Sequence, residues 1–226
     1  MAVLVTCEHA SARVPARWAA ALRRARPLLG GHRAFDAGAA LLARDLARAL
    51  RAPLFLGTAT RLLVDLNRSP DNPRRFSSFT RALPSEDRAR IMARHYWPYR
   101  LAVEEAVRTA GRPVLHLAVH SFAPVLAGRP RTMDVGLLYD PARRRERRVA
   151  DTWQRALRAG APGLHVARNR PYRGTSDGLA TALRRVLADR RYAGLELEVN
   201  QAVVRAPARW TALRRLLTRT AETLEP

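Results

Sequence analysis

The sequence contains a single cysteine, no lysine and no apolar run of membrane-spanning length. Cys7 alone cannot form an internal disulfide or supply a multi-cysteine metal cluster. A bilayer-spanning helix needs about 20 consecutive apolar residues, so no membrane association is expected. Residues 1–7 have neither a basic stretch before their apolar residues nor a small-residue cleavage site after them, so no signal peptide is expected. These features together predict a soluble, cytoplasmic protein.

The absence of lysine bears on how the strong positive charge is interpreted. All 41 basic residues are arginine, against 19 acidic residues, and the formal net charge is +22. Such a charge can attract nucleic acid through phosphate contacts. The arginines are dispersed along the chain, however, and the densest cluster, residues 143–148, is typical of a solvated helix start. Nucleic acid is therefore not the expected partner, although a non-catalytic, basic nucleic-acid-binding protein stays open as an alternative.

The length and the order of apolar segments predict the fold class. A chain of 226 residues with 47% hydrophobic residues suits one domain over residues 1–226, since single cores grow to about 250 residues. Short apolar strands alternate with longer amphipathic stretches, which indicates an α/β domain with a mixed central β-sheet flanked by helices. Strands are expected at residues 3–7, 53–57, 62–66, 113–119, 133–139, 164–167 and 195–199. Helices are expected at residues 35–51, 85–110 with a kink at Pro98, 142–159, 179–191 and 208–224, and a long loop at residues 67–84.

Three polar residues follow or begin these elements and have the chemistry of a metal site. His9 comes after the first strand, His120 ends an apolar strand, and Asp36 begins a helix. Two imidazoles and a carboxylate form a zinc set that leaves one position for water. The spacing alone is a weak signal, because a capping Asp36 or a hydrogen-bonded His9 would be more common. Iron, cobalt or manganese also suits this ligand set.

The segment 61–68, Arg-Leu-Leu-Val-Asp-Leu-Asn-Arg, is more specific. Its alternation predicts a strand that carries Asp65, Asn67 and Arg68 to its C-terminal end. An adjacent Asn-Arg pair suits a carboxylate, because guanidinium binds that group bidentately and the amide adds a donor. The alternative is a strand end with Asn67 in a turn and Asp65 paired with Arg68.

A second alternating segment, residues 195–200, carries Glu196, Glu198 and Asn200 on one face. Buried carboxylates are costly unless they meet a metal, an arginine or a proton-transfer task. The arrangement therefore suggests a general base, whereas the same alternation on an exposed edge strand would be ordinary solvation. Of the remaining candidates, Cys7 could line the site but is expected to be a small buried apolar residue, and His116 is expected to be a core histidine.

Taken together, these segments resemble the N-formylglutamate amidohydrolase family. The sequence Asp65-Leu-Asn-Arg68 resembles the carboxylate-binding signature of the zinc carboxypeptidase and aspartoacylase superfamily. The narrower resemblance rests on His9, Phe35-Asp36-Ala-Gly-Ala, His120-Ser-Phe, Asp134-Val-Gly-Leu-Leu-Tyr139, Asn169-Arg-Pro-Tyr172 and Glu196-Leu-Glu198. Their order and spacing match from His9 to Gln201. The resemblance implies a phosphorylase/hydrolase-like, zinc-exopeptidase-like fold and one zinc ion as cofactor.

The resemblance also implies a role for individual residues. His9 and His120 would be zinc ligands, and Glu198 would be the general base and acid that activates the water at the zinc. Asn67 and Arg68 would bind the substrate carboxylate. Arg61 would stabilise the developing oxyanion, although it lies one residue closer to Asn67 than in aspartoacylases. Tyr172 would close over the substrate.

One departure from the superfamily pattern concerns the carboxylate ligand. The superfamily uses H-x-x-E, whereas His9 is followed by Ala10, Ser11 and Ala12. Asp36 is the candidate ligand instead, since Glu8 would point to the opposite side if the strand continued.

The resulting hypothesis is a zinc-dependent hydrolase that cleaves the amide of a small anionic N-acyl amino acid such as N-formylglutamate. The alternatives are a related deacylase or carboxypeptidase with another acyl substrate, and a member of the family that has lost its metal.

Overall fold

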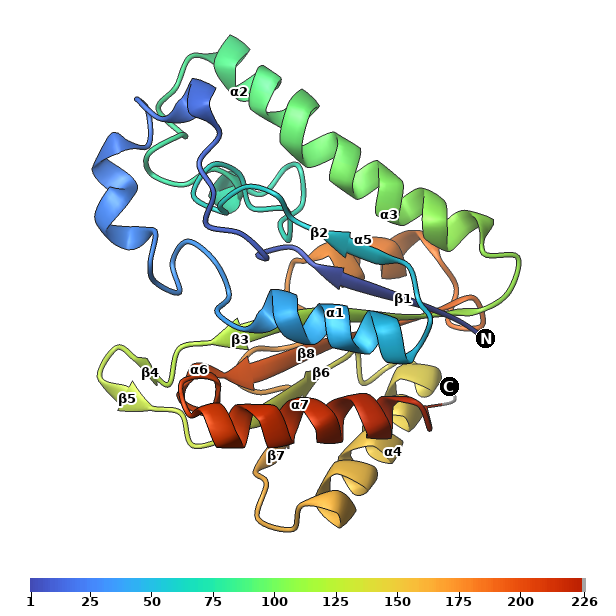
Figure 1. The fold of residues 1–226 in the computed structure, drawn as a ribbon. Helices are drawn as coiled ribbons and strands as arrows, with labels where there is room; N and C mark the ends of the chain where they lie inside the picture. The colour runs from blue at the N-terminus through green and yellow to red at the C-terminus, as the bar shows by residue number, and fades with distance from the viewer. Residues whose placement is uncertain (225–226) are drawn as a thin grey trace.

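A six-stranded mixed sheet forms the centre of the computed structural model, which describes residues 1–224 (Figure 1). Its strands are β1 (Ala2–Cys7), β2 (Leu54–Leu56), β3 (Val114–Phe122), β6 (Val135–Leu138), β7 (Val166–Arg168) and β8 (Tyr192–Asn200). They lie in the order β2-β1-β3-β8-β6-β7. Strands β2, β1, β3 and β8 are mutually parallel, and β6 runs antiparallel to β8. The C-terminal ends of β1, β3 and β8 therefore meet at one edge of the sheet.

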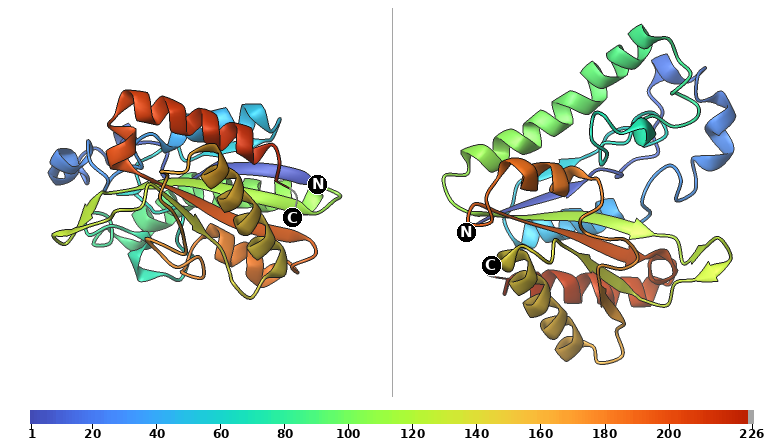
Figure 2. Two further views of the ribbon diagram at one scale, coloured as in Figure 1. Left: turned by 90° about the horizontal axis from the view of Figure 1, so that it is seen from below. Right: turned by 180° about the vertical axis from the view of Figure 1, so that it is seen from behind.

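Helices cover both faces of this sheet (Figures 1 and 2). The helices are α1 (Ala39–Ala49), α2 (Ser85–Ile91), α3 (Trp97–Thr109), α4 (Arg144–Gly160), α5 (Leu179–Val186), α6 (Gln201–Val204) and α7 (Pro207–Ala221). Helices α1, α4 and α7 pack on one face, where their apolar stripes join the largest core cluster. Helices α3 and α5 pack on the other face in a smaller cluster. A short hairpin, β4 (Val125–Leu126) and β5 (Arg129–Pro130), extends beyond β3.

The two faces of the central strands differ in polarity. Because side chains alternate along a strand, Cys7, Val119 and Leu197 lie on the face that joins the α1–α4–α7 cluster. The residues next to them, Glu8, His120 and Glu198, belong to the opposite face. These three polar side chains are each no more than 5% exposed. One half of the sheet is thus a core surface and the other carries buried polar groups near its C-terminal edge.

A third cluster packs outside the sheet, between the N-terminal loops and the helices α2 and α3. It joins residues from two irregular stretches, including Trp18, Leu22, Leu63, Ile91 and Tyr96. Most of these stretches form turns and 3₁₀ helices (Ala16–Trp18, Arg23–Leu28 and Pro73–Arg75). This cluster anchors residues 62–66, because Leu62, Leu63, Val64 and Leu66 belong to it.

The predicted α/β class with a mixed, helix-flanked sheet is confirmed, but one predicted strand is wrong. Residues 62–66 form turns and an irregular segment. The segment still buries Leu62, Leu63 and Val64, each at most 6% exposed, because they enter the third cluster instead of pairing with the sheet. A short apolar run does not by itself distinguish a buried strand from a buried loop.

The helix predicted at residues 85–110 is a continuous helical segment that contains one π-helical turn. A π-helical turn at Met92–Tyr96 separates α2 from α3, immediately before Pro98. Proline has no N–H to donate to the preceding turn, which explains why the regular hydrogen-bond pattern changes here. Among residues 1–224, no helix is both long and apolar enough to cross a membrane.

Candidate active site

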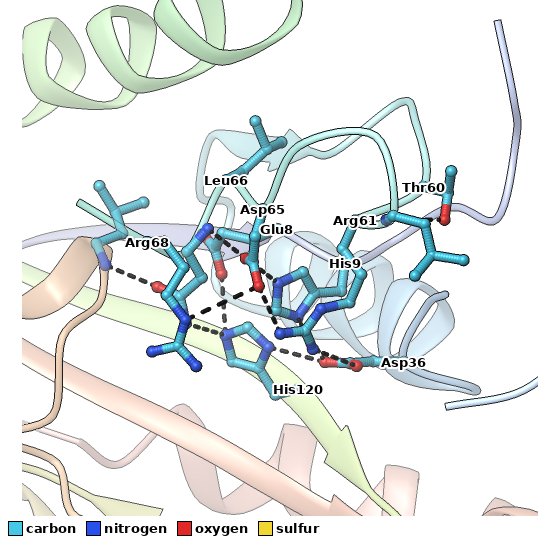
Figure 3. Close-up of polar contacts among 12 residues, drawn as sticks. Glu8, His9, Asp36, Thr60, Arg61, Asp65, Leu66, Arg68 and His120 are labelled. Carbon is cyan, nitrogen blue, oxygen red and sulfur yellow. Dashed lines mark hydrogen bonds and ion pairs between the residues drawn. The ribbon is translucent and has the colours of Figure 1, made fainter. Parts of the chain in front are cut away.

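The parallel strands bring the candidate residues to one sheet edge, as Figure 3 shows for His9, Asp36 and His120. His9 follows the end of β1, while His120 lies near the end of β3. Glu198 on β8 is the register partner of His120 on the neighbouring strand. Asp36 comes from the loop before α1, whose backbone is tied to the β1 end by a 3.0 Å hydrogen bond from Asp36 N to His9 O.

His9, Asp36 and His120 form a compact buried cluster that can hold a metal ion. Their ligand atoms all lie within 4.8 Å of one another. Asp36 Oδ2 is 3.2 Å from His9 Nδ1 and 2.8 Å from His120 Nδ1. The carboxylate does not cap α1, since the N-cap of that helix is Gly38. Two imidazole nitrogens and one carboxylate oxygen match the donor set of a catalytic zinc site.

The second nitrogen of each histidine also meets a carboxylate. His9 Nε2 lies 2.7 Å from Asp65 Oδ1, and His120 Nε2 lies 3.0 Å from Glu8 Oε2. A carboxylate on the outer nitrogen fixes the ring orientation and directs the other nitrogen, here Nδ1, toward a metal. Glu8 was expected to point to the side opposite His9. It follows β1 directly, and its carboxylate contacts the outer nitrogen of His120 on the polar face of the sheet.

The buried carboxylates set the charge of this cluster. Burial opposes ionisation of Glu8, but its hydrogen bond to His120 lowers the pKa to about 2. Burial also disfavours a charged His120, yet the hydrogen bonds to Asp36 and Glu8 raise its pKa well above the ordinary value. Asp36 has a lowered pKa because His9 and His120 outweigh its burial. These carboxylates therefore favour positive charge between the two imidazoles, which a divalent cation would supply.

The cluster forms the floor of a pocket of about 400 Å³. The pocket is lined by His9, His32, Asp36, Arg61, Asn67, Arg68, Arg74, His120, Ser121, Phe122, Ala123, Tyr172, Arg173, Ser176, Asp177, Glu196 and Glu198. Eight residues to which the sequence assigned a role in the site line this one cavity: His9, Asp36, Arg61, Asn67, Arg68, His120, Tyr172 and Glu198. A concave pocket with convergent polar groups is the usual form of a small-molecule site.

Arg61 lies between the metal cluster and the Asp65 carboxylate (Figure 3). Its NH2 donates to Asp65 Oδ2 at 2.5 Å, and its NH1 lies 3.2 Å from His9 Nδ1. Burial opposes the charge of Arg61, but Asp65 and Asp36 raise its pKa further, so the guanidinium keeps its charge. A fixed positive charge therefore lies beside the atoms that would hold the metal.

Asn67 and Arg68 line the wall of the pocket next to this cluster. Asn67 Nδ2 lies 3.4 Å from His120 Nε2, and Arg68 Nε lies 4.0 Å from Asp65 Oδ2. Tyr172 is 43% exposed at the rim, where its hydroxyl accepts a hydrogen bond from Arg131 NH1 at 3.1 Å. The guanidinium of Arg131 also lies 5.0 Å from the centre of the Tyr172 ring.

Glu198 carries the group best suited to proton transfer. It is 5% exposed, and its Oε2 has no hydrogen-bond partner within residues 1–224. Burial, together with the negative charges of Asp36 and Glu196, raises its pKa to about 8 against the opposing effect of His120. Glu196 also lines the pocket, as the strand alternation predicts. A carboxyl group with a pKa near neutrality can both accept and donate a proton.

The remaining sequence candidates lie elsewhere. Cys7 is fully buried on the apolar face and does not line the pocket, because the chain turns at Glu8 and His9 leaves the strand direction. His116 is a core histidine, as expected, with hydrogen bonds to Thr6 and Tyr192. Asp177, which no sequence motif singled out, also lines the pocket, from the loop before α5. The only local signal was a polar Thr-Ser-Asp-Gly stretch before an apolar helix.

Comparison with known proteins assigns this α/β protein with a buried His-Asp-His cluster to an amidohydrolase family. The family model of N-formylglutamate amidohydrolase matches residues 1–205, and the chain belongs to this family. A gene product of Agrobacterium tumefaciens has a similar structure, with a TM-score of 0.80 and 30% identity over 97% of this chain and 88% of that one. An N-formylglutamate amidohydrolase from Ralstonia eutropha has the same fold, with a TM-score of 0.66 and 23% identity over 98% and 94%. A search of curated proteins finds no match.

Proposed function

We propose that this protein is a zinc-dependent amidohydrolase that releases the acyl group from a small anionic N-acyl amino acid such as N-formylglutamate. Membership of the N-formylglutamate amidohydrolase family supports this activity. We further propose that residues 1–226 form one catalytic domain related to the zinc carboxypeptidase and aspartoacylase superfamily. The observation that carries the proposal is the convergence of two histidine Nδ1 atoms and Asp36 Oδ2 in the pocket of Glu198, a buried carboxylate whose Oε2 has no hydrogen-bond partner within residues 1–224.

The metal would be held by His9, Asp36 and His120. The donor set and its compact geometry fit zinc, and the carboxylates of Asp65 and Glu8 would hold both rings in place. A zinc ion bound there supplies Lewis-acid chemistry: it polarises an amide carbonyl and lowers the pKa of water.

Asn67 and Arg68 would bind the carboxylate of the substrate. The amide and the guanidinium both donate hydrogen bonds, and a guanidinium binds a carboxylate through two parallel ones. Docking of the carboxylate on this wall orients the N-acyl group toward the floor of the pocket. Arg61 would stabilise the negative charge that develops on the carbonyl oxygen, since its guanidinium is held beside His9 by Asp65. Tyr172 would cover the open side of the pocket.

Glu198 would move the proton. Its unpaired Oε2 accepts a proton from the attacking water and then delivers it to the nitrogen of the leaving amine. This role is supported because Glu198 is the register partner of His120 and lines the same pocket as His9, Asp36 and His120. The same carboxyl group therefore serves both proton transfers.

The test is the metal content of the purified protein together with its hydrolytic activity. The wild type should bind close to one zinc per chain, and His9→Ala, Asp36→Ala and His120→Ala should each lose most of it. His165→Ala, which removes an exposed histidine, is the matched control and should keep its zinc. Assays with N-formyl, N-acetyl and peptidyl glutamate then distinguish the amidohydrolase from a deacylase or carboxypeptidase. A folded wild type that takes up no supplied zinc would contradict the proposed chemistry.

A further inference from the structure

A short segment at the start of α5, residues 177–179, contacts both side chains that are proposed to bind the substrate carboxylate. Leu179 N donates a 2.6 Å hydrogen bond to Asn67 Oδ1. The Asp177 carbonyl oxygen accepts a 2.9 Å hydrogen bond from Arg68 NH1. Since the Asn67 oxygen is taken, its amide nitrogen is the atom directed toward the pocket and His120. This orientation presents a donor to an incoming carboxylate.

The Asp177 side chain also holds the turn that follows Arg68. Its Oδ2 accepts hydrogen bonds from Ser69 N at 3.1 Å and from Asn72 Nδ2 at 2.5 Å. Its Oδ1 accepts a hydrogen bond from the Ser69 hydroxyl. Ser69 itself is only 5% exposed. One carboxylate thus satisfies several donors of a turn more than 100 residues away in the sequence, directly beside the carboxylate-binding pair.

Gly178 allows the close approach between the two segments. A Cβ atom at this position would lie 2.9 Å from Asn67 Oδ1 and 3.5 Å from Asn67 Cγ. The backbone of Gly178 is extended, with φ −174°, so a larger residue would not strain it. The requirement for glycine therefore comes from the Asn67 side chain and not from the conformation of the chain.

The loop that leads to residues 177–179 is held by hydrogen bonds of its own, so it can keep Asn67 and Arg68 in place. Asn169 Oδ1 accepts hydrogen bonds from Tyr139 N and Gly174 N, both at 3.0 Å. Arg184 on α5 donates to the Gly174 carbonyl at 2.5 Å. The loop between β7 and α5 is therefore tied to the sheet at one end and to a helix at the other.

We propose that Asp177 and Gly178 are positioning residues for Asn67 and Arg68, an inference that rests on the proposed function. They hold the Asn67 amide with its nitrogen toward the pocket. They also hold Arg68 through the hydrogen bond from NH1 to the Asp177 carbonyl oxygen, which leaves the other guanidinium donors for the substrate. Loosening this contact allows the Asn67 amide to turn its oxygen toward an anionic substrate, which weakens binding. The metal cluster is held by other residues and is not affected.

The experiment compares Asp177→Asn and Gly178→Ala with the wild type, using N-formyl-L-glutamate as substrate. Each variant should raise KM about tenfold, the scale of one hydrogen bond to a charged group, with kcat within about twofold. The zinc content should stay at the wild-type level. The matched controls should behave as wild type: Asp71→Asn, an exposed residue in the turn that Asp177 contacts, and Gly163→Ala, where a Cβ meets nothing within 4 Å. In an Arg68→Ala background, Asp177→Asn should add less than it does alone.

The inference is overturned if the wild type is active and both variants keep its KM, or if kcat falls while KM does not change. An inactive wild type would instead count against the proposed function. In that case calorimetric titration with L-glutamate decides about the positioning role. Weaker glutamate binding in both variants supports it, and unchanged binding, or none in the wild type, overturns it.

Discussion

Among the residues that the structure describes, Glu198 combines burial with a carboxylate oxygen, Oε2, that has no hydrogen-bond partner, as a purely structural residue seldom does. Burying a carboxylate without a partner costs several kcal/mol of folding free energy, so such groups are expected where they serve a reaction. Asp36 and Glu196 lie close enough to raise its pKa further, while His120 opposes them. The environment thus keeps the group near the point where it can exchange protons.

The residue-scale prediction concerns the Glu198→Gln variant. Glutamine has nearly the same shape but cannot take a proton from water, so kcat should fall by roughly 10²- to 10⁴-fold. The zinc content and the circular dichroism spectrum should not change, because Glu198 is not in the metal cluster. Glu104→Gln, on an exposed position of α3, serves as the control. Steady-state assays that find more than a tenth of the wild-type kcat in Glu198→Gln would exclude it as the proton carrier.

At the scale of elements, an irregular segment rather than a strand carries Asn67 and Arg68, the residues proposed to bind the substrate. Backbone carbonyls in such a segment need partners from side chains, because no neighbouring strand supplies them. Thr80 is fully buried, and its hydroxyl donates a 2.9 Å hydrogen bond to the Leu63 carbonyl. Ser77 donates to the Leu62 carbonyl at 2.5 Å. These two hydroxyls fix the path that leads to Asp65 and Asn67.

The element-scale prediction is that Thr80→Val destabilises the protein. Valine keeps the shape but leaves the Leu63 carbonyl without this donor, which should lower the free energy of unfolding by about 1–3 kcal/mol. Urea denaturation of the two proteins measures the difference. Thr58→Val, at an exposed threonine of a nearby loop, should have little effect. Equal midpoints for wild type and Thr80→Val would show that the segment does not depend on this hydrogen bond.

For the whole molecule, the polar face of the sheet makes stability depend on pH. His116 lies behind the site, fully buried, with Nε2 2.8 Å from Thr6 Oγ1 and Nδ1 2.7 Å from the Tyr192 hydroxyl. Burial is the main reason why its pKa falls to about 4, and the charges of Arg184, Arg100 and His120 act in the same direction. The charge of Glu8 opposes them. The folded protein thus resists protonation of a group that the unfolded chain protonates near pH 6.5.

The sign of the effect follows from this lowered pKa. Below about pH 6.5 His116 binds a proton in the unfolded chain but stays neutral in the folded protein. The free energy of unfolding therefore falls as the pH drops toward 4. The full contribution is roughly 3 kcal/mol, at 1.36 kcal/mol for each pKa unit. Unfolding curves at pH 7, 6, 5 and 4 should show a shallower loss of stability for His116→Asn than for the wild type. Parallel losses in both proteins would contradict a neutral buried His116.

The sequence by itself determined the α/β class, most of the strands and helices, and many of the residues that line the pocket. The reason is that these properties follow from the local order of apolar and polar residues. The apolar run of β3 and the alternation of β8 follow from which residues are buried on each face. Short recognisable segments around His9, Asn67 and Glu198 identified the family. The run at residues 62–66 shows the limit, because burial alone does not decide between a strand and a loop.

Only the tertiary structure decided how these residues meet. Asp36 and His120 are 84 positions apart, and Ser69 and Asp177 are 108 apart. Their contacts depend on the strand order β2-β1-β3-β8-β6-β7, which no local pattern encodes. The same holds for Glu8, whose side chain reaches His120 because β1 and β3 are parallel neighbours. The local sequence determines which side chains of a segment are buried. The packing of distant segments determines which buried polar side chains lie next to one another and form the site.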